Sequence, residues 1–329
     1  MRFALSAEQE QFATSLDALL TDADTPSVVR SWSSGRTGPG TALWRELAQV
    51  GVFGLLVPER FGGVAASPVD LVVAFDRLGY HAVPGPLVES AAASPALLDG
   101  TAGERFLPQL CSGDLLATLA LEPHVPFALD ADVAGLVLRV DGSVVHGSVV
   151  AGEPMSSVDH SRRLFTVTDG RALGAGAVQR AFDLGALACA AQLCGAGRWL
   201  LDAATEYVKQ RRQYGRALGQ FQAVKHLLAD VATQLELARP LLHGAAIAVS
   251  TAQDAAPDVS AAKVAAADAA NLAARTCLQL HGAVGYTAEH DMGLWLTKVR
   301  ALLGAWGTQA HHRERVASGL GLLATRSGA

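Results

Sequence analysis

The chain has 329 residues, of which 50% are hydrophobic and 17% charged, and its formal net charge is −5. This apolar fraction excludes extended disorder, because it is large enough to bury a core. The mild negative charge, with no separate run of Lys or Arg, excludes a typical nucleic-acid-binding surface. No apolar signal segment opens the sequence, and charged residues border or interrupt its most apolar stretch, residues 184–201. We therefore expect a cytoplasmic, globular protein that neither spans a membrane nor binds nucleic acid.

Residues 1–114 predict a helical N-terminal domain. Ser6, followed by acidic residues, suits a helix start, and apolar residues then recur at helical spacing. A second helix is predicted around residues 43–50. The segment GVFGLLVPERFGG at residues 51–63 is rich in Gly and Pro, which predicts a turn-rich crossing. Another apolar helix is expected to follow over residues 68–78.

Residues 115–180 predict a small β domain. The segment AGLVLRVDGSVVHGSVV holds an Asp141-Gly142 pair between two strand-like runs, which is a strong hairpin signal. The domain has room for only a few strands of typical length. The GRALGAG stretch at residues 170–176 lacks the third glycine and the βαβ context of a dinucleotide-binding loop, so we do not interpret it as one.

Residues 181–329 predict a C-terminal four-helix bundle. Breaks near residues 214–219, 255–258 and 281–291 divide the apolar periodicity into four helices. Pro240 is expected to kink or break the second helix if that helix runs so far. The predicted fold class is therefore mainly α, with a small central β domain.

Two segments of the bundle have side chains suited to a nucleotide. They read RRQYGRALGQFQAVKHLLAD at residues 211–230 and QLHGAVGYTAEHDM at residues 279–292. Arg211 can pair with a pyrophosphate, and Gln222 and Gln279 supply amide donors and acceptors. The glycines after Gln279 let backbone N–H groups approach phosphate oxygens. Taken singly, a basic helix end and ordinary glycine caps would explain each segment, but the two together favour a cofactor interface.

These segments resemble motifs of the acyl-CoA dehydrogenase family. The first is similar to R-x-x-F-G-x-x-x-x-x-x-Q-x-x-x-x-x-L-A-D, with Tyr214 in place of Phe. The second is similar to Q-x-H-G-G-x-G-Y-T, with Ala283 in place of the second glycine. The crossing at residues 51–63 is a weaker match to G-x-x-G-x-x-x-P-E-x-x-G-G. Together the three segments span nearly the whole chain in the family's order.

The resemblance implies FAD as the cofactor. In the family these segments bind the ADP half of an FAD that is held mainly by a neighbouring subunit. An oligomer is therefore expected. The cofactor-binding residues that the resemblance assigns are Arg211, Gln213, Tyr214, Phe221, Gln222, Gln279, Gly282, Ala283, Thr308 and Gln309.

The family's catalytic glutamate is missing from both places that the family uses. Trp306 stands where the last helix of many members carries Glu, in AWGTQ against Y-E-G-T, and Gly185 stands at the alternative position. Neither can accept a proton, so we assign no catalytic residue to this chain. Asp183 is two residues from the second position, an offset of about 200° around a helix. We interpret it as a helix cap or surface charge, with a displaced base as the alternative.

The middle domain also departs from the family. The loop LALEPHVPFALD keeps Glu122 and Pro123 but has Leu121 in place of the family's threonine. We therefore expect that this subunit holds no isoalloxazine ring of its own. These losses resemble the base-lacking subunit of actinobacterial heteromeric acyl-CoA dehydrogenases of steroid degradation.

That resemblance implies a subunit of an acyl-CoA dehydrogenase that desaturates the α,β bond of a CoA thioester, with a steroid-derived thioester as the suggested class. Its partner would be a homologous catalytic subunit in an α2β2 heterotetramer. Two alternatives remain open. The chain could be a self-sufficient flavoenzyme of the same fold with a displaced base or a different reaction, or it could be a non-catalytic scaffold.

No metal site is predicted. The four cysteines show no CxxC spacing, which indicates buried thiols. His311 and His312 are adjacent and do not share a helix face, so we interpret them as a solvated helix end.

Overall fold

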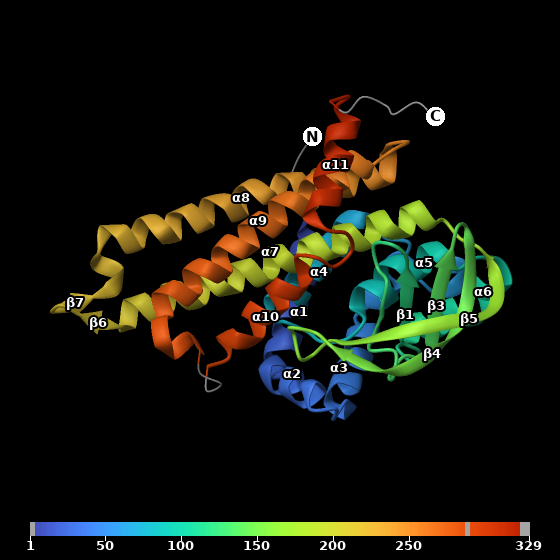
Figure 1. The fold of residues 1–329 in the computed structure, drawn as a ribbon, viewed down its shortest axis with the longest axis horizontal. Coiled ribbons are helices and arrows are strands. Elements are labelled where there is room, and N and C mark those ends of the chain that lie inside the picture. Colours follow the sequence, from blue (N-terminus) through green and yellow to red (C-terminus); the bar gives the residue numbers. More distant parts are fainter. Residues whose placement is uncertain (1–3, 287–289, 323–329) are drawn as a thin grey trace.

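The computed structural model describes residues 4–286 and 290–322 (Figure 1). The α-helices are α1 (Ala7–Asp22), α2 (Thr25–Ser33), α3 (Gly38–Gln49), α4 (Pro68–Tyr80), α5 (Ser94–Leu97), α6 (Gly100–Ser112), α7 (Val178–Gln210), α8 (Gln222–Thr251), α9 (Ala256–His281), α10 (Met292–Leu302) and α11 (Gln309–Gly319). The strands are β1 (Ala117–Leu121), β2 (Ala128–Leu129), β3 (Leu136–Asp141), β4 (Val144–Ser156), β5 (Arg163–Ala175), β6 (Arg212–Gln213) and β7 (Arg216–Ala217). Short 3₁₀ turns are η1 (Val52–Gly54), η2 (Glu59–Phe61), η4 (Leu218–Gln220) and η5 (Gly282–Tyr286), and η3 (Glu89–Ala93) is a π turn.

The N-terminal helices form as predicted. Ser6 and Gln9 make a reciprocal capping box at the start of α1, and Ser67 opens α4 in the same way. Helix α4 then packs against α7 at a crossing where both backbones carry glycine. A Cβ on Gly195 of α7 would lie 1.9 Å from the Asp76 carbonyl oxygen of α4, so only glycine allows this approach.

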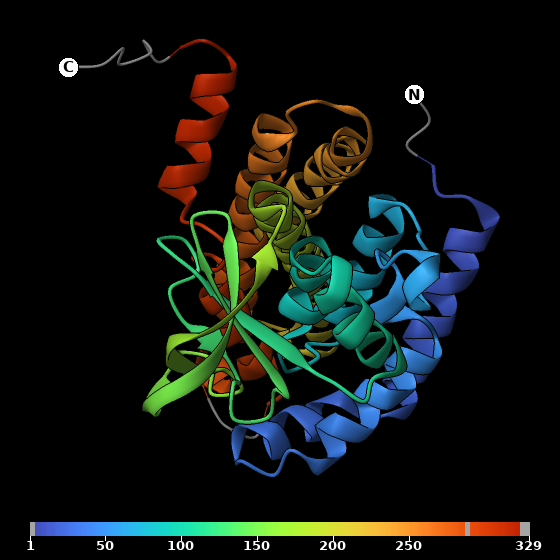
Figure 2. The ribbon, with the colours of Figure 1, turned by 90° about the vertical axis from the view of Figure 1, so that its right-hand side faces the viewer.

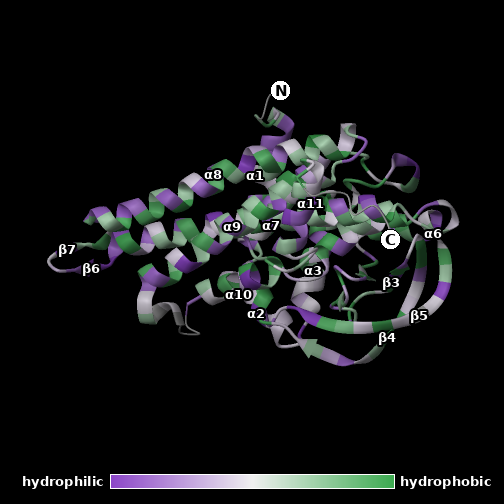
Figure 3. Cartoon of the chain, turned by 45° about the horizontal axis from the view of Figure 1, so that its top comes forward, coloured by the Kyte–Doolittle hydropathy of each residue, from purple (hydrophilic) through white to green (hydrophobic). Residues whose placement is uncertain are grey.

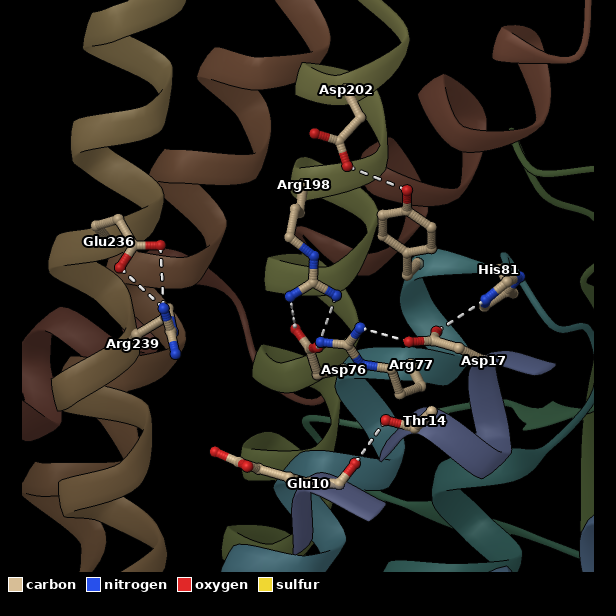
Figure 4. Close-up of polar contacts among 11 residues, drawn as sticks. Glu10, Thr14, Asp17, Asp76, Arg77, His81, Arg198, Asp202, Glu236 and Arg239 are labelled. Carbon is tan, nitrogen blue, oxygen red and sulfur yellow. Dashed lines mark hydrogen bonds and ion pairs between the residues drawn. The ribbon is translucent and has the colours of Figure 1, made fainter. Parts of the chain in front are cut away.

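Ion pairs link α1, α4 and α7 at the same crossing (Figure 4). Arg77 pairs with Asp17 at 2.8 Å and with Asp76 at 2.9 Å, and Arg198 pairs with Asp76 at 2.8 Å. Asp17 also accepts from His81 at 3.0 Å. Since these groups are only partly exposed, the network fixes the angle of α4 on the bundle more firmly than isolated surface pairs would.

The central sheet has the strand order β1-β3-β4-β5-β2, in which β1 and β3 are parallel and the other neighbours antiparallel. Asp141 pairs with Val144 across a tight turn, which confirms the predicted hairpin, and Gly142 takes the φ of +58° that the turn requires. Strand β5 includes most of the GRALGAG stretch, so no dinucleotide loop exists there. Figure 2 shows the sheet in front of the bundle, beside the N-terminal helices.

The predicted bundle is present, with two differences. Pro240 does not end α8, which continues to Thr251, because Pro240 lies on the exposed side where water can solvate the carbonyl that it frees. The fourth helix is split after Leu302 into α10 and α11. Figure 3 shows hydrophobic and hydrophilic residues alternating along α8, as expected of a helix with one buried face.

Helix α7 lies in the middle of the bundle. In the described part of the chain it is the one helix long and apolar enough to cross a membrane, yet 83% of its most apolar window is buried inside the protein. It packs against α4, α8 and α9. The four cysteines are free thiols and three of them are buried, as predicted.

Candidate functional site

The two residues at the family's base positions face each other. Gly185 lies in α7 and Trp306 lies between α10 and α11. A Cβ on Gly185 would lie 2.2 Å from the indole Cε3 and Cζ3 atoms, so the ring packs directly on the backbone of α7. Trp306 is only 2% exposed. One aromatic ring therefore covers both places from which a glutamate would act.

The backbone and the neighbours of Trp306 fix its position. Its φ of +57° is rare for a bulky residue and persists only where the surroundings enforce it. The Trp306 carbonyl accepts a hydrogen bond from His312 Nε2 at 2.9 Å, and Ser260 Oγ lies 3.0 Å from His312 Nδ1. With Nε2 protonated, Nδ1 accepts from the serine hydroxyl, so the imidazole is neutral.

The interpretation of His311 and His312 as a solvated helix end was wrong for His312. It is fully buried, because α11 packs against α9 after the break that follows Leu302. Burial lowers the pKa of His312 to about 3. His311 is half-buried and stacks on His124 with ring centroids 3.8 Å apart.

This pKa predicts acid sensitivity. Below about pH 6.5 the histidine is protonated in the unfolded chain, whereas His312 stays neutral in the folded protein. The free energy of unfolding therefore falls as the pH drops from 6.5 toward 3. We expect His312→Gln to lose less thermal stability than the wild type between about pH 6.5 and 5. Thermal melts at several pH values measure this, with exposed His160→Gln as control. An unchanged slope in His312→Gln would contradict the assignment.

A cavity of about 240 Å³ lies beside Trp306. Its apolar wall comes mainly from the loop between β1 and β2 and from the segment after α10, and its polar groups include Glu89 and Arg162. Glu89 opens the π turn η3 and is 3% exposed. Its Oε2 atom has no hydrogen-bond partner among the described residues. Burial raises the pKa of Glu89.

Sequence reasoning did not find Glu89. The only signal in the sequence is a single carboxylate within an apolar run, LVESAAAS, where an ordinary surface charge is not expected. Its proximity to Trp306 depends on the packing of η3 under the bundle.

Asp183 is neither a helix cap nor a surface charge, so that interpretation was wrong. Helix α7 begins at Val178, which places Asp183 inside the helix on a buried face. Arg315 Nη2 lies 2.6 Å from Oδ1 and Gln179 Nε2 lies 3.0 Å from Oδ2. Both oxygens are therefore held by neighbours, and the residue joins α11 to α7.

The first predicted cofactor segment forms a projecting hairpin at one end of the bundle (Figure 1). Tyr214 lies at the tip, where it is 89% exposed and has a φ of +52°. The Arg216 guanidinium lies 3.9 Å above the Phe221 ring, which fixes the base of the hairpin. Gln213 in β6 is also exposed.

The second segment lies at the same end. The Tyr207 ring stacks on His281 with centroids 4.1 Å apart, which joins the end of α7 to the end of α9. Gln279 is exposed close to this contact, and Gly282 and Ala283 are exposed just after it. Residues 287–289 of the motif lie outside the described residues.

Thr308 and Gln309 lie elsewhere. Thr308 caps α11 by accepting from the His311 N–H at 3.2 Å, and Gln309 Nε2 donates to Asp268 at 3.1 Å. Asp268 precedes His281 by 13 residues of α9, or roughly 20 Å. The predicted cofactor residues thus form two groups within one chain.

Two family models match this chain: the acyl-CoA dehydrogenase N-terminal domain over residues 6–114 and the C-terminal domain over residues 173–321. The chain belongs to the acyl-CoA dehydrogenase family. Acyl-CoA dehydrogenase IpdE2 of Mycolicibacterium smegmatis is 31% identical over 296 residues, which are 89% of this chain and 93% of that protein. Membership of the family confirms the predicted fold class. It also supports an oxidoreductase activity and confirms FAD as the cofactor.

The solved structures that share the fold of this acyl-CoA dehydrogenase chain include two from pairs of differently named chains. One is the ChsE4-ChsE5 complex from Mycobacterium tuberculosis, with a TM-score of 0.84, 22% identity and complete coverage of both chains. The other is a variant of the steroid ACAD Tcur3481-Tcur3483, with a TM-score of 0.82, 23% identity, and coverage of 96% of this chain and 98% of that one.

The residues at the hairpin end fit the nucleotide half of FAD. Arg211, Gln222 and Gln279 are exposed, and their side chains make no hydrogen bond within residues 4–286 and 290–322. A guanidinium, two amides and an exposed glycine turn supply the donors that a pyrophosphate and an adenosine require. Since these side chains are exposed and no described residue bonds to them, a neighbouring molecule can reach them.

Proposed function

We propose that this chain is the base-lacking subunit of a heteromeric acyl-CoA dehydrogenase that desaturates the α,β bond of a CoA thioester. A homologous subunit supplies the glutamate that removes the α-proton. The observation that carries this proposal is the packing of Trp306 on Gly185, which leaves neither family position able to provide a base.

Several similarities support the subunit role. The ChsE4-ChsE5 structure, which has this fold, is a complex, and the Tcur3481-Tcur3483 structure of the same fold also carries two names. A steroid-derived thioester is the proposed substrate class, because the second of them is a steroid ACAD. We propose an α2β2 assembly in the cytoplasm. We also propose that this chain divides into an N-terminal helical domain of residues 1–114, a middle β domain of residues 115–180 and a C-terminal bundle of residues 181–329.

In this assembly the residues of this chain bind and position the cofactor, and they take no part in removing the proton. Arg211, Gln222 and Gln279 hold the ADP half of an FAD whose ring lies in the partner, and bound FAD supplies the hydride acceptor. Trp306 fills the former base position and excludes water from it. The mechanism therefore divides proton removal and part of the cofactor binding between two subunits.

Co-expression tests the proposal. The chain is produced alone and together with a homologue that retains the glutamate, and bound FAD and acyl-CoA oxidation are measured. We expect activity only from the pair, and the partner's Glu→Gln variant should abolish it. Yellow, active protein from this chain alone would contradict the heteromer proposal.

The cofactor contacts are tested separately. In the mixed complex, Arg211→Ala combined with Gln279→Ala should weaken FAD binding by about 10- to 100-fold, because charge-assisted hydrogen bonds to phosphate are lost. Titration of the apo complex with FAD measures the change. Arg105→Ala, which removes an exposed arginine from α6, is the control. Unchanged FAD affinity in the double variant would refute these contacts.

A further inference from the structure

A cleft lies between α8 on one side and α4 and α7 on the other, and its volume is about 390 Å³. Charged side chains of both signs line it, namely Asp76, Arg77, Arg198, Glu236 and Arg239. Figure 4 shows Glu236 and Arg239 on α8 opposite Arg198 and Asp76. A ligand in this cleft therefore meets charged groups on both walls.

The wall formed by α4 and α7 is held by several ion pairs. Asp76 accepts two hydrogen bonds from Arg198, at 2.8 and 3.3 Å, and it also pairs with Arg77 at 2.9 Å. Arg77 in turn pairs with Asp17 of α1. Two carboxylates thus balance two guanidinium groups, and this wall carries no net charge. Arg198 keeps N–H groups that its pair with Asp76 does not use.

The wall formed by α8 is more open. Arg239 Nη1 donates to the two oxygens of Glu236 at 2.9 and 3.1 Å, and neither side chain bonds to any other described residue. The side chains are 54% and 67% exposed, so their pair contributes little to stability and separates at low cost. The guanidinium has further N–H groups, and the carboxylate has further lone pairs. This wall thus offers a donor and an acceptor to a ligand.

The net charge of the cleft defines the class of ligand. Its three arginines are balanced by Asp17, Asp76 and Glu236. A simple anion would meet the carboxylates and a simple cation the guanidinium groups, so each would be repelled by like charge. A molecule with both charges can form charge-assisted hydrogen bonds with both kinds of group. The cleft therefore selects a zwitterion.

The cleft also has room for an apolar group. Its remaining lining residues are Cys194, Leu201, Ala232 and Leu235. An apolar cavity of about 150 Å³ holds benzene. The volume of about 390 Å³ therefore accommodates a ring together with a short charged chain.

We propose that this cleft binds a zwitterionic α-amino acid with an apolar side chain. Its carboxylate accepts hydrogen bonds from Arg198 and Arg239, and its ammonium group donates to Glu236. Its side chain lies against Leu201 and Leu235.

The proposed amino-acid site is separate from the proposed FAD segments and from the base positions. Arg239 is 17 residues from Gln222, or roughly 25 Å along α8. Arg198 is 13 residues from Gly185, or roughly 20 Å along α7. The site goes beyond the proposed function, and its test on the chain alone does not depend on a heteromer.

Fluorine NMR titrations of the full chain test the site with three probes of similar shape. These are 4-fluorophenylalanine, its deaminated analogue 3-(4-fluorophenyl)propanoate and its decarboxylated analogue 2-(4-fluorophenyl)ethylamine. We expect the amino acid to bind about tenfold more tightly than either analogue, because each analogue loses one charge-assisted contact. Equal or tighter binding of either analogue, or no binding of the amino acid, would overturn the proposal.

Two variants locate the contacts. Glu236→Gln should lower the affinity for the amino acid to about that of the propanoate, whose binding it leaves no weaker. Arg239→Gln should reduce the preference for the amino acid over the ethylamine several-fold. Both side chains are more than half exposed, so the variants should fold, which thermal melts check. Glu206→Gln is the matched control, because Glu206 makes the same kind of exposed pair with Lys209 on α7, and it should change nothing.

Two results would refute the amino-acid site even if the wild-type chain binds the amino acid. One is the wild-type preference in both Glu236→Gln and Arg239→Gln. The other is loss of binding in the mixed complex with the partner subunit, which would assign the cleft to a subunit contact instead. We expect the mixed complex to bind the amino acid as the chain alone does.

Discussion

Trp306→Ala is expected to lower the free energy of unfolding by about 3–5 kcal/mol, the usual cost of removing a large buried aromatic side chain. The ring fills the space over Gly185, so its removal leaves a void against the backbone of α7. Urea unfolding followed by circular dichroism measures the loss.

A double-mutant cycle isolates the contact between the two base positions. Gly185→Ala alone should destabilise by about 1–3 kcal/mol, because the new methyl group meets the indole at 2.2 Å. In the Trp306→Ala background the same methyl group enters an empty space and should cost little, which gives a coupling of similar size. Additive effects would show that the ring does not pack on Gly185.

Gly195→Ala is the second change with a large expected effect, about 3 kcal/mol of destabilisation. Its Cβ would lie 1.9 Å from the Asp76 carbonyl oxygen and 2.7 Å from the Tyr80 nitrogen, both of them backbone atoms that cannot rotate away. Helices α4 and α7 would have to separate, which would also strain the Arg198 ion pair.

Gly244→Ala is the matched control for that change. Gly244 lies in α8, and an added Cβ would meet no atom within 4 Å. Alanine should therefore stabilise by about 0.5–1 kcal/mol through helix propensity alone. Denaturation midpoints of the two variants measure the contrast. Equal effects would refute the close crossing of α4 and α7.

The features that the sequence predicted well are local ones. Capping residues, the turn at Gly142 and the apolar periodicity of α7, α8 and α9 all act over a few neighbouring residues, so they can be recognised without the fold. The split of the last helix was missed, because it depends on Trp306 adopting a positive φ under the constraint of its neighbours.

The candidate site was predictable only in part. The substitutions at both base positions were visible in the sequence, but their mutual contact was not, since Gly185 and Trp306 are 121 positions apart. Glu89 and the burial of His312 were missed for the same reason. Both depend on segments that meet only after the bundle has assembled.

The contact between Trp306 and Gly185 also makes the loss of the base hard to reverse. Glutamate at position 185 has no room while the indole of Trp306 is present. Glutamate at position 306 would leave a void over Gly185 and would place its own charge in a buried position. A glutamate at position 185 therefore needs a second, smaller residue at position 306 to make room for it. The two positions are sterically coupled, so a substitution at one of them changes the space that is available at the other.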